Sequence, residues 1–556
     1  MLQKLKSFFI LYLPLAILTA FSIYFIAGYI LISFSRMNIE WNIGPFEDAS
    51  LRAVLKILNN EPLYSRAALD YIPLIYAPLY FKLASISLYI FGVSFASLRI
   101  PSILSMLIAP VIFYYISAVF FINKSQKFIS AFLISGILFS IYFSTGLWFD
   151  LAKVDALFIL FTSLTVLFLF KSLRENSAVS FIFLIIFASS LIFIKQTGIV
   201  FTGISALAFL YFRDIKRFFI FSSASGSIIL MIYFLYALLP DENLFFYTVN
   251  VPSKHAFINF NFLSEIKVII SALFISPLVF AVTRHSYFAE KLYSSSGKKE
   301  DHTVKFLIIM IAMSAAALFI GITGRMKYGG VSNSFIYTVI FLSMFSGIYL
   351  TENIFQTLMG IKRNHLTKLQ AVIFFILFIF TALHFKMNFY YFPYVIKDFS
   401  RKKALVSSLK KNLCELEYPG LFLSDATYLQ SYYCKQKANF AYITVMDIVP
   451  LESEFSRIVT TLESSLKNHE FKFILMDKKT YIPREEINTA LAYINKRLTE
   501  KISSAEKNHL KSFKNALLLN LTLNEHYRPT DELTPAEKNY ADLNMEYDGS
   551  HIVFLK

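Results

Sequence analysis

The chain has 556 residues, of which 56% are hydrophobic and only 16% are charged, and it contains 61 phenylalanines and 33 tyrosines. This composition excludes an ordinary soluble domain and is typical of a polytopic α-helical membrane protein. The formal net charge of +16 would suggest nucleic-acid binding in a soluble protein. Here much of the basic excess lies in short loops between apolar segments, so it indicates membrane topology and contact with membrane lipids, and no nucleic acid.

The apolar segments predict the membrane spans. The first of them follows Lys4 and Lys6 and is too long for a cleavable signal, so we expect a retained anchor. We expect eleven crossings, at residues 8–31, 97–122, 127–147, 151–170, 178–195, 198–212, 217–239, 266–282, 305–323, 333–350 and 368–386. A twelfth segment, 73–92, is short, rich in tyrosine and interrupted by two prolines and a lysine, which favours an interfacial or re-entrant helix.

Basic clusters in the loops set the orientation. If all twelve segments crossed, Lys4/Lys6 and Lys124/Lys127 would face opposite sides of the membrane. If 73–92 does not cross, all six basic clusters share one face, which the positive-inside rule places in the cytoplasm. We therefore predict a multi-pass protein of the cell inner (plasma) membrane with a cytoplasmic N-terminus. The alternative, in which 73–92 is an ordinary span, stays open.

The last third of the chain is soluble in character, so we expect a transmembrane domain over 1–386 and an external domain over 387–556. Strands and helices alternate in this second part, which favours a small α/β domain. The expected strands are 421–424, 441–445, 471–476, 545–547 and 551–555, and the expected helical segments are 404–416 and 485–518. Cys414 and Cys434 both lie here, where an external location permits a disulfide between them.

The acidic pair Glu47-Asp48 follows the first apolar segment. A helix with one apolar face is expected over 49–58, which places both acids in its first turn at the membrane surface. A carboxylate held and partly desolvated in this way suits a general base. The alternative is that the two acids only favour the positive end of the helix.

A second acidic group follows at the external turn near residue 150. Asp150 lies in the turn, and Lys153 and Asp155 lie further into the next span. Ionisable groups at that depth are costly and usually face a partner or water. In the structural alternative, Lys153 neutralises Asp150 at a spacing of three residues.

Two further polar breaks carry cations on the same face. Lys195 and Gln196 separate two apolar segments, and such a cation with amide donors suits a phosphate, although a lysine at a span end can also simply extend to the interface. Arg325 and Lys327 precede a Gly-Gly pair and Asn333. Two cations beside a Gly-Gly pair, which allows close approach of the backbone, form a basic pocket on a face that should be poor in cations, and this favours a diphosphate or lipid-phosphate site.

The order of these motifs resembles the GT-C glycosyltransferases. The resemblance rests on the acidic pair and its helix, on a proline-rich aromatic segment that ends in Phe91–Ser102, on Phe149–Asp155, on Lys195-Gln196-Thr197, and on Gly324-Arg325 with the later glycines. It is similar to the protein O-mannosyltransferase and lipid A aminoarabinose transferase-like families and to a bacterial branch of that class, over roughly residues 1–350. It implies a GT-C-like fold with interfacial helices in the first external loop.

The resemblance also implies a function. The donor would be a polyprenyl-phosphate sugar, and the acceptor a lipid, a glycan or a protein on the external face. In those families the first acid of the loop pair is the usual catalytic carboxylate, which corresponds to Glu47. The order here is Glu-Asp instead of the commoner Asp-Glu, so either Glu47 or Asp48 is the expected base, and Asp150 matches the second external acid.

The remaining site residues follow from the same comparison. Lys195, Arg325 and Lys327 correspond approximately to positions that contact the donor phosphate. Supporting roles are expected for Lys153, Asp155, Gln196 and Asn333. No cofactor is certain, but Glu47, Asp48 and Asp150 offer oxygen ligands of the kind that Mg²⁺ or Mn²⁺ prefers.

Two other classes compete with a transferase. A transporter or flippase of a lipid-linked saccharide also explains external cations and charges within the membrane, but it predicts inverted repeats and broken spans in matching positions, which the sequence does not show. A purely structural membrane protein leaves the Asp150 group unexplained. The sequence therefore favours an enzyme.

Overall fold

A computed structural model describes most of the first 358 residues and parts of the remainder. The described residues are 2–44, 46–142, 145–255, 257, 302–327, 330, 332–358, 420–423, 444–448, 451–468, 473–477, 484–500, 510, 514, 528–529 and 551–555. The spans expected at 266–282 and 368–386, the helix expected at 404–416, the strand expected at 545–547 and both cysteines lie outside them.

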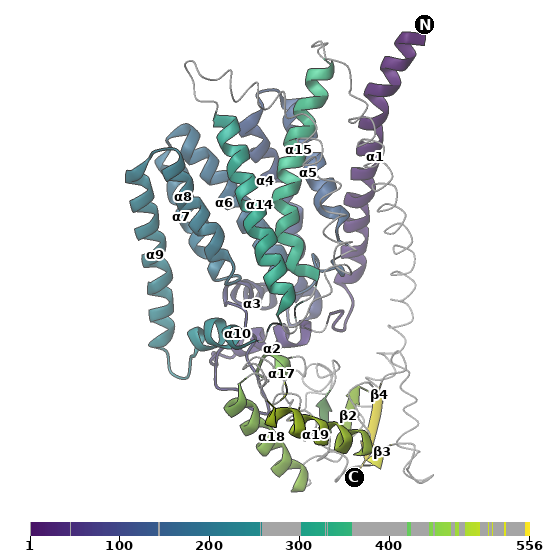
Figure 1. Ribbon diagram of the computed structural model, residues 1–556, viewed down its shortest axis with the longest axis vertical. Helices are drawn as coiled ribbons and strands as arrows, with labels where there is room; N and C mark the ends of the chain where they lie inside the picture. The colour runs from purple at the N-terminus through teal and green to yellow at the C-terminus, as the bar shows by residue number, and fades with distance from the viewer. Residues whose placement is uncertain are drawn as a thin grey trace.

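The long helices stand side by side in one bundle (Figure 1). They are α1 (Leu2–Met37), α4 (Phe95–Phe120), α5 (Lys124–Ser140), α6 (Val154–Glu175), α7 (Ala178–Ile192), α8 (Gly198–Tyr211), α9 (Ile215–Ala237), α14 (His302–Met326) and α15 (Ile336–Leu358). Among the described residues, six helices are long and apolar enough to cross a membrane, namely α1, α4, α6, α9, α14 and α15. The chain is therefore a multi-pass membrane protein.

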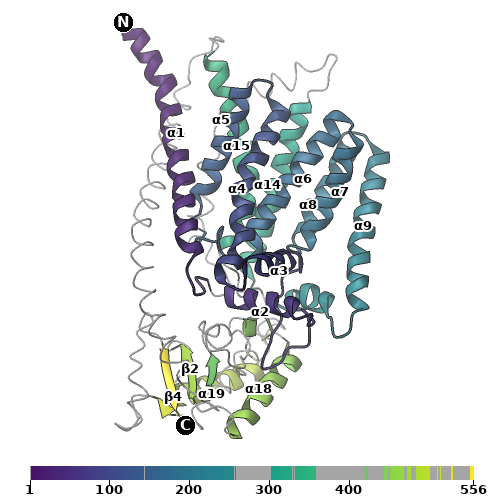
Figure 2. The same ribbon diagram turned by 180° about the vertical axis from the view of Figure 1, so that it is seen from behind.

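The expected count of eleven spans stays a prediction. Helix α8 has 14 residues, which at the rise of an α-helix is a length of about 21 Å, against about 30 Å for the hydrocarbon core. Helices α5 and α7, with 17 and 15 residues, are also short. In the bundle they nevertheless run alongside the longer helices (Figures 1 and 2).

Local sequence explains where the helices begin and end. Side-chain oxygens of Ser94, Asn123, Ser177 and Asp214 accept hydrogen bonds from backbone N–H groups in the first turns of α4, α5, α7 and α9. These are residue types that cap helices by satisfying N–H groups without intrahelical partners. Gly92 follows the helix α3 (Leu79–Phe91) with φ +83°, a conformation that favours glycine.

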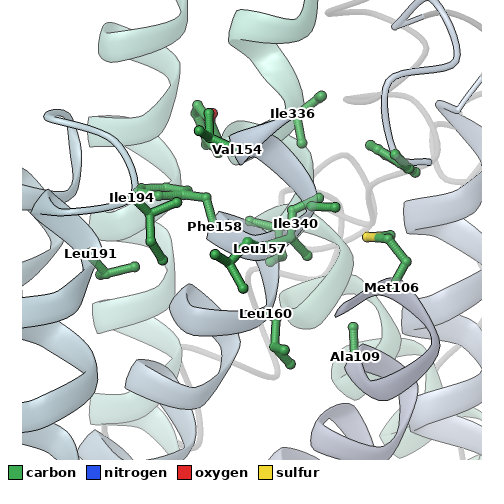
Figure 3. Packing of buried hydrophobic residues seen from close by; sticks show 14 of the residues in the cluster. Met106, Ala109, Val154, Leu157, Phe158, Leu160, Leu191, Ile194, Ile336 and Ile340 are labelled. Carbon is green, nitrogen blue, oxygen red and sulfur yellow. The ribbon is translucent and has the colours of Figure 1, made fainter. Parts of the chain in front are cut away.

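The core of the bundle forms around α6. Its side chains Leu157 and Phe158 lie between α4 on one side and the end of α7 on the other, and Ile340 of α15 lies next to them (Figure 3). Glycines allow close packing of neighbouring helices: a Cβ at Gly347 of α15 would collide with the Ile134 side chain of α5, and a Cβ at Gly136 of α5 would collide with Ser22 of α1. Small residues at such contacts let helices approach within a membrane, where apolar surface alone gives little drive for association.

Two shorter helices lie across one end of the bundle, α2 (Glu47–Leu58) and α3 (Leu79–Phe91) (Figures 1 and 2). The Nη1 atom of Arg99, near the start of α4, donates to the Arg36 carbonyl near the end of α1 at 3.0 Å. The segment between α1 and α4 therefore returns to the end from which it left, and the prediction that 73–92 does not cross is confirmed. Exposed apolar side chains on α3, such as Tyr89 and Phe91, suit a helix at the membrane interface.

The C-terminal part contains a four-stranded sheet in the order β1-β2-β4-β3. Strands β1 (Gly420–Leu423) and β2 (Phe473–Asp477) are parallel, and β4 (His551–Leu555) is antiparallel to both β2 and β3 (Arg528–Pro529). The mixed sheet is accompanied by α17 (Val445–Ile448), α18 (Glu452–Lys467) and α19 (Arg484–Thr499). Parallel strands need a long crossover, and α18 lies within the connection from β1 to β2.

Strands β1, β2 and β4 match three of the expected strands. The strand expected over 441–445 is wrong at its described end, since Thr444 begins a helical turn that continues into α17. Helix α18 was not expected. The boundary proposed between residues 386 and 387 lies outside the described residues.

The C-terminal part is attached to the end of the bundle that carries α2 and α3 (Figure 1). Arg66, in the loop between α2 and α3, donates to Glu454 of α18 at 2.9 Å. Arg457 of the same helix donates to the Ala67 carbonyl. His255, just after α10 (Val251–Lys254), shares a hydrogen bond of 3.1 Å with the Asp447 carbonyl in α17.

Candidate functional site

Buried charged side chains gather at this same end of the bundle. Those with at most 8% of their surface exposed are Arg36, Glu47, Asp48, Arg52, Arg99, Asp150, Lys153, Asp155, His255 and Asp447. Burying a charge is costly unless a partner compensates for it. The hydrogen-bond and ion-pair partners of each group therefore indicate whether it is available to bind a ligand.

Glu47 accepts four hydrogen bonds and is fully buried. Arg99 donates to both carboxylate oxygens, at 2.9 Å from Nε and 2.7 Å from Nη2. The backbone N–H groups of Ile43 and Ala152 each add a bond of 2.8 Å. Burial alone would raise the pKa of Glu47, but Arg99 and the backbone donors hold that pKa below its ordinary value. All four lone-pair positions are occupied, so this carboxylate fixes α2 to α4 and to the loop before α6.

Asp48 is also buried and lies one helical turn before Arg52, whose Nε atom is 3.3 Å from each carboxylate oxygen. Helix α2 begins at Glu47, so the prediction that both acids lie in its first turn is confirmed. The hydrogen bonds of Glu47 reach Arg99 and two loops, so its role extends beyond the favourable electrostatics of a helix start.

Asp150 pairs with Arg36. Its Oδ1 atom lies 3.0 Å from Arg36 Nη1 and accepts a 2.7 Å hydrogen bond from the Tyr142 hydroxyl. Its Oδ2 atom is buried and has no partner among the described residues. Burial raises the pKa of Asp150, and Arg36 opposes this rise. The suggestion that Lys153 neutralises Asp150 is wrong. The spacing of three residues brings side chains together only within a helix, and α6 starts at Val154, after both of them.

Lys153 is buried between aromatic rings. Its ammonium lies 3.2 Å from the centre of the Trp148 ring and 3.7 Å from that of Phe46. Within the described residues, its Nζ atom has no hydrogen-bond partner. Burial lowers the pKa of Lys153 well below its ordinary value, and Asp155 and Glu47 oppose that effect. Aromatic faces attract a cation but leave all three of its N–H donors available to a ligand.

Asp155 organises a second cluster. Its Oδ1 atom lies 3.1 Å from Lys195 Nζ and 2.6 Å from the Tyr337 hydroxyl, and its Oδ2 atom accepts from Asn333 at 3.4 Å. Lys195 also donates to the Tyr337 hydroxyl at 2.5 Å. The structure thus brings together three predicted residues from α6, from the turn before α8 and from the turn before α15.

The remaining predicted phosphate ligands, together with Gln196, bind backbone carbonyls of loops at this end. Arg325 donates to the Gly330 carbonyl at 2.7 Å, and Lys327 donates to the Pro252 carbonyl at 2.9 Å. Gln196 donates to the Ile75 carbonyl. The expected close backbone approach is present, because a Cβ at Gly330 would lie only 2.2 Å from a backbone oxygen.

Asp447 enters the site from the C-terminal part. Its carboxylate is buried, and its Oδ2 atom has no hydrogen-bond partner in the part of the chain that the structure describes. Burial raises the pKa of Asp447 to about 7, and the charge of Lys153 opposes this rise. Nothing in the sequence singled out this residue, because the segment around it was expected to be a strand.

Sequence reasoning also missed the partners of the acids. Arg36 and Arg99 are single charges near the ends of apolar helices, and such charges are costly there unless they are paired. That cost is a usable indication of a buried partner. Tyr142 and Tyr337 carry no such indication, because tyrosine is abundant throughout the chain.

The contacts of the acidic side chains bear on whether they can hold a metal ion. In the part of the chain that the structure describes, no three His, Cys, Asp or Glu side chains lie close enough to hold an ion. Oxygens of Glu47 and Asp150 are bonded to guanidinium groups. Glu47, Asp48 and Asp150 therefore do not fit the expected Mg²⁺ or Mn²⁺ site.

Comparison with known proteins supports the resemblance seen in the motifs. Residues 76–241 match the family described as dolichyl-phosphate-mannose-protein mannosyltransferase. No curated protein sequence matches the chain. The matched segment runs from the loop before α3 to the end of α9 and contains Asp150, Lys153, Asp155 and Lys195.

Solved structures give the fold. The structure of ArnT from Cupriavidus metallidurans bound to undecaprenyl phosphate is 12% identical, with a TM-score of 0.52, over 83% of this chain and 94% of that one. The apo structure of the same protein has a TM-score of 0.51, at 12% identity and the same two coverages. An oligosaccharyltransferase from Archaeoglobus fulgidus is 13% identical over 84% of this chain and 71% of that one, but its TM-score of 0.48 is too low to add to the argument. The expected GT-C-like fold is confirmed.

Proposed function

We propose that the protein is a glycosyltransferase that moves a sugar from a polyprenyl-phosphate donor to a lipid, glycan or protein acceptor at the membrane surface. The GT-C-like fold and the matched mannosyltransferase segment support this class of reaction. The ArnT structure was obtained with undecaprenyl phosphate, a lipid phosphate of the kind proposed here as the donor's carrier.

One observation carries the proposal: the Lys153 ammonium is buried and has no hydrogen-bond partner within the described residues. A polyprenyl-phosphate sugar is a phosphodiester with one negative charge, and loss of the sugar leaves a monoester that can carry a second. A desolvated cation beside this phosphate stabilises the developing charge more strongly than it would in water. Lys153 is therefore the proposed ligand of the leaving phosphate.

The predicted phosphate ligands Lys195, Arg325 and Lys327 would act on the donor less directly than Lys153. Lys195 is held by Asp155 and Tyr337, so it would act on the phosphate only by sharing or exchanging these contacts. Arg325 and Lys327 shape the loops of the same end through carbonyl contacts. Their positive charges add to the local potential that favours an anionic lipid head group.

The orientation and the inner-membrane location belong to the proposal as well. Helices α4 and α6 start at the site, through Arg99 and Asp155, so Lys124 after α4 and Arg174 near the end of α6 lie at the other end of the bundle. The positive-inside rule places that other end in the cytoplasm. The site would then face outward, together with the C-terminal part.

Reconstitution in liposomes tests this function. The wild-type protein should bind undecaprenyl phosphate and should transfer label from at least one member of a panel of radiolabelled undecaprenyl-phosphate hexoses and pentoses to a total envelope extract. A flippase would move such lipids across the bilayer without breaking the bond between the sugar and the phosphate. Lipid movement without sugar release would therefore contradict the proposal.

Substitution of Lys153 tests the observation that carries it. Lys153→Met should weaken binding of undecaprenyl phosphate by roughly 10- to 100-fold, the equivalent of one charge-assisted hydrogen bond. The same change should raise the thermal stability of the ligand-free protein, because it removes a buried charge. Lys56→Met is the matched control, since Lys56 also lies over an aromatic ring, that of Tyr71, but is paired with Glu61. Unchanged binding in Lys153→Met would refute the role of Lys153.

A further inference from the structure

We infer that Asp447, supplied by the C-terminal part of the chain, completes the site as the carboxylate that accepts the proton of the acceptor hydroxyl. The inference rests on the proposed transfer reaction and names the base for it. It also assigns a direct chemical role to a region that the motif comparison left without one.

The first step of the argument is that the other acids at this end are already engaged. Glu47 has donors on all its lone-pair positions. Both oxygens of Asp155 accept hydrogen bonds, and both oxygens of Asp48 face the Arg52 guanidinium. Asp150 keeps one oxygen without a partner, but its other oxygen is held by Arg36 and by a tyrosine hydroxyl.

Asp447 differs from all of these. Its Oδ2 atom is buried without a partner, and no hydrogen bond or ion pair within the described residues holds its carboxylate. Leaving a buried polar group unsatisfied costs about 1 to 3 kcal/mol. An alanine would avoid that cost, so the carboxylate at this position calls for a ligand that can hydrogen-bond to it.

The position of Asp447 is fixed through its backbone and its neighbours. The His255 ring bonds to its carbonyl at 3.1 Å, and α17 packs against α10. The charged and titratable groups that act on its surroundings are Lys153, whose charge opposes the rise of its pKa, Tyr76, whose own pKa it raises further, and His255. The charge of Lys153, the proposed phosphate ligand, thus acts on Asp447, which the C-terminal part supplies.

A second attachment keeps α17 in place. The next helix, α18, contacts the loop between α2 and α3 through Glu454, which binds Arg66, and through Arg457, which binds the Ala67 carbonyl. Two elements of the C-terminal part therefore contact the membrane domain at the site. This arrangement suits a segment that contributes to catalysis and can define the acceptor side.

Asp447 and Lys153 together account for the proton and for the leaving group of the proposed transfer. The acceptor O–H transfers its proton to the Asp447 carboxylate while the acceptor oxygen bonds to the anomeric carbon of the sugar. The bond from that carbon to the donor phosphate breaks, and its electron pair stays on the phosphate oxygen, beside the Lys153 ammonium. The proton on Asp447 then returns to solvent. A base is most effective when its pKa lies near the working pH, and burial raises the pKa of Asp447 to about 7.

Kinetics of Asp447 variants in liposomes test the inference, with the radiolabelled donor panel and the envelope extract as substrates. The wild-type rate should rise with pH and level off above about pH 7. Asp447→Asn should lower kcat by roughly 100- to 10,000-fold, remove the rise with pH, and leave binding of undecaprenyl phosphate unchanged. Asp447→Glu should restore part of the rate.

The matched control is Glu454→Gln, which weakens the attachment of α18 and should keep the pH dependence of the wild type. If Asp447→Asn retains the wild-type kcat and pH dependence, the inference is overturned while the proposed function stands. If Asp447→Asn loses lipid-phosphate binding together with activity, and Asp447→Glu rescues neither, Asp447 is structural and the inference also fails. A wild-type protein that neither binds undecaprenyl phosphate nor transfers any sugar overturns both proposals.

Discussion

The fixed contacts of Glu47 lead to a sharp prediction about the acidic pair. Glutamine at position 47 keeps the size of the side chain but replaces one oxygen by an NH₂ group. That group would face either the Arg99 guanidinium or a backbone N–H, because all four contacts of Glu47 come from donors. Glu47→Gln therefore leaves the Arg99 charge, which is fully buried, without a compensating negative charge.

The magnitude follows from this geometry. Breaking a buried ion pair by removing one partner costs about 3 to 5 kcal/mol. The folded fraction relative to the unfolded one would fall by roughly two to three orders of magnitude, since each 1.4 kcal/mol is about a factor of ten. By contrast, Glu61→Gln breaks a pair with Lys56 in which Glu61 is 45% exposed, and it should cost no more than about 1 kcal/mol.

The assay is reversible unfolding in mixed detergent micelles, with activity measured on the same preparations. Glu47→Gln, Arg99→Gln and the double variant form a cycle, and the double variant should be less destabilised than the sum of the two single variants. A Glu47→Gln protein as stable as the wild type but inactive would refute the reasoning. It would make Glu47 a chemical base, as the resemblance first implied, instead of a residue that positions α2.

Three further outcomes are expected from the structure. A cysteine at Asn59 should react with an impermeant reagent added outside intact cells, and one at Ser125 should not; external labelling at Ser125 would overturn the orientation. Lys195→Met and Asp155→Asn should be coupled by about 0.5 to 3 kcal/mol in a stability cycle, whereas simple additivity would show that the contact contributes nothing. The folded protein binds the proton of Asp447 more tightly than the unfolded chain, because its pKa rises from 3.8 to about 7. Its contribution to stability should therefore decline as pH rises through that window, and Asp447→Asn should remove this slope, as measured by unfolding at a series of pH values.

Local and periodic information in the sequence was enough for the general architecture. Apolar segments predicted the long helices, and the distribution of basic residues predicted that 73–92 stays at one end of the bundle. Helix periodicity placed Glu47 and Asp48 in the first turn of α2. Each of these inferences depends on residues within about one helix length, where spacing alone decides which side chains share a face.

The sequence by itself did not single out Arg36, Arg99 or Asp447. It did indicate several other charged side chains of the site, because ionisable groups in apolar surroundings are conspicuous. It did not determine how they pair. Glu47 meets Arg99 across 52 positions, Asp150 meets Arg36 across 114, and Asp155 meets Tyr337 across 182.

Only the tertiary structure decided those partners. A buried charge requires compensation, but many residues can provide it, and helix packing selects among them. Within the described residues, the packing left Lys153 without a hydrogen bond, and its charge acts on Asp447 from the C-terminal part of the chain. Asp447 is the proposed base, with Lys153 as the proposed phosphate ligand, because each of the other acids at the site already accepts a hydrogen bond. Only the complete fold could show these bonds.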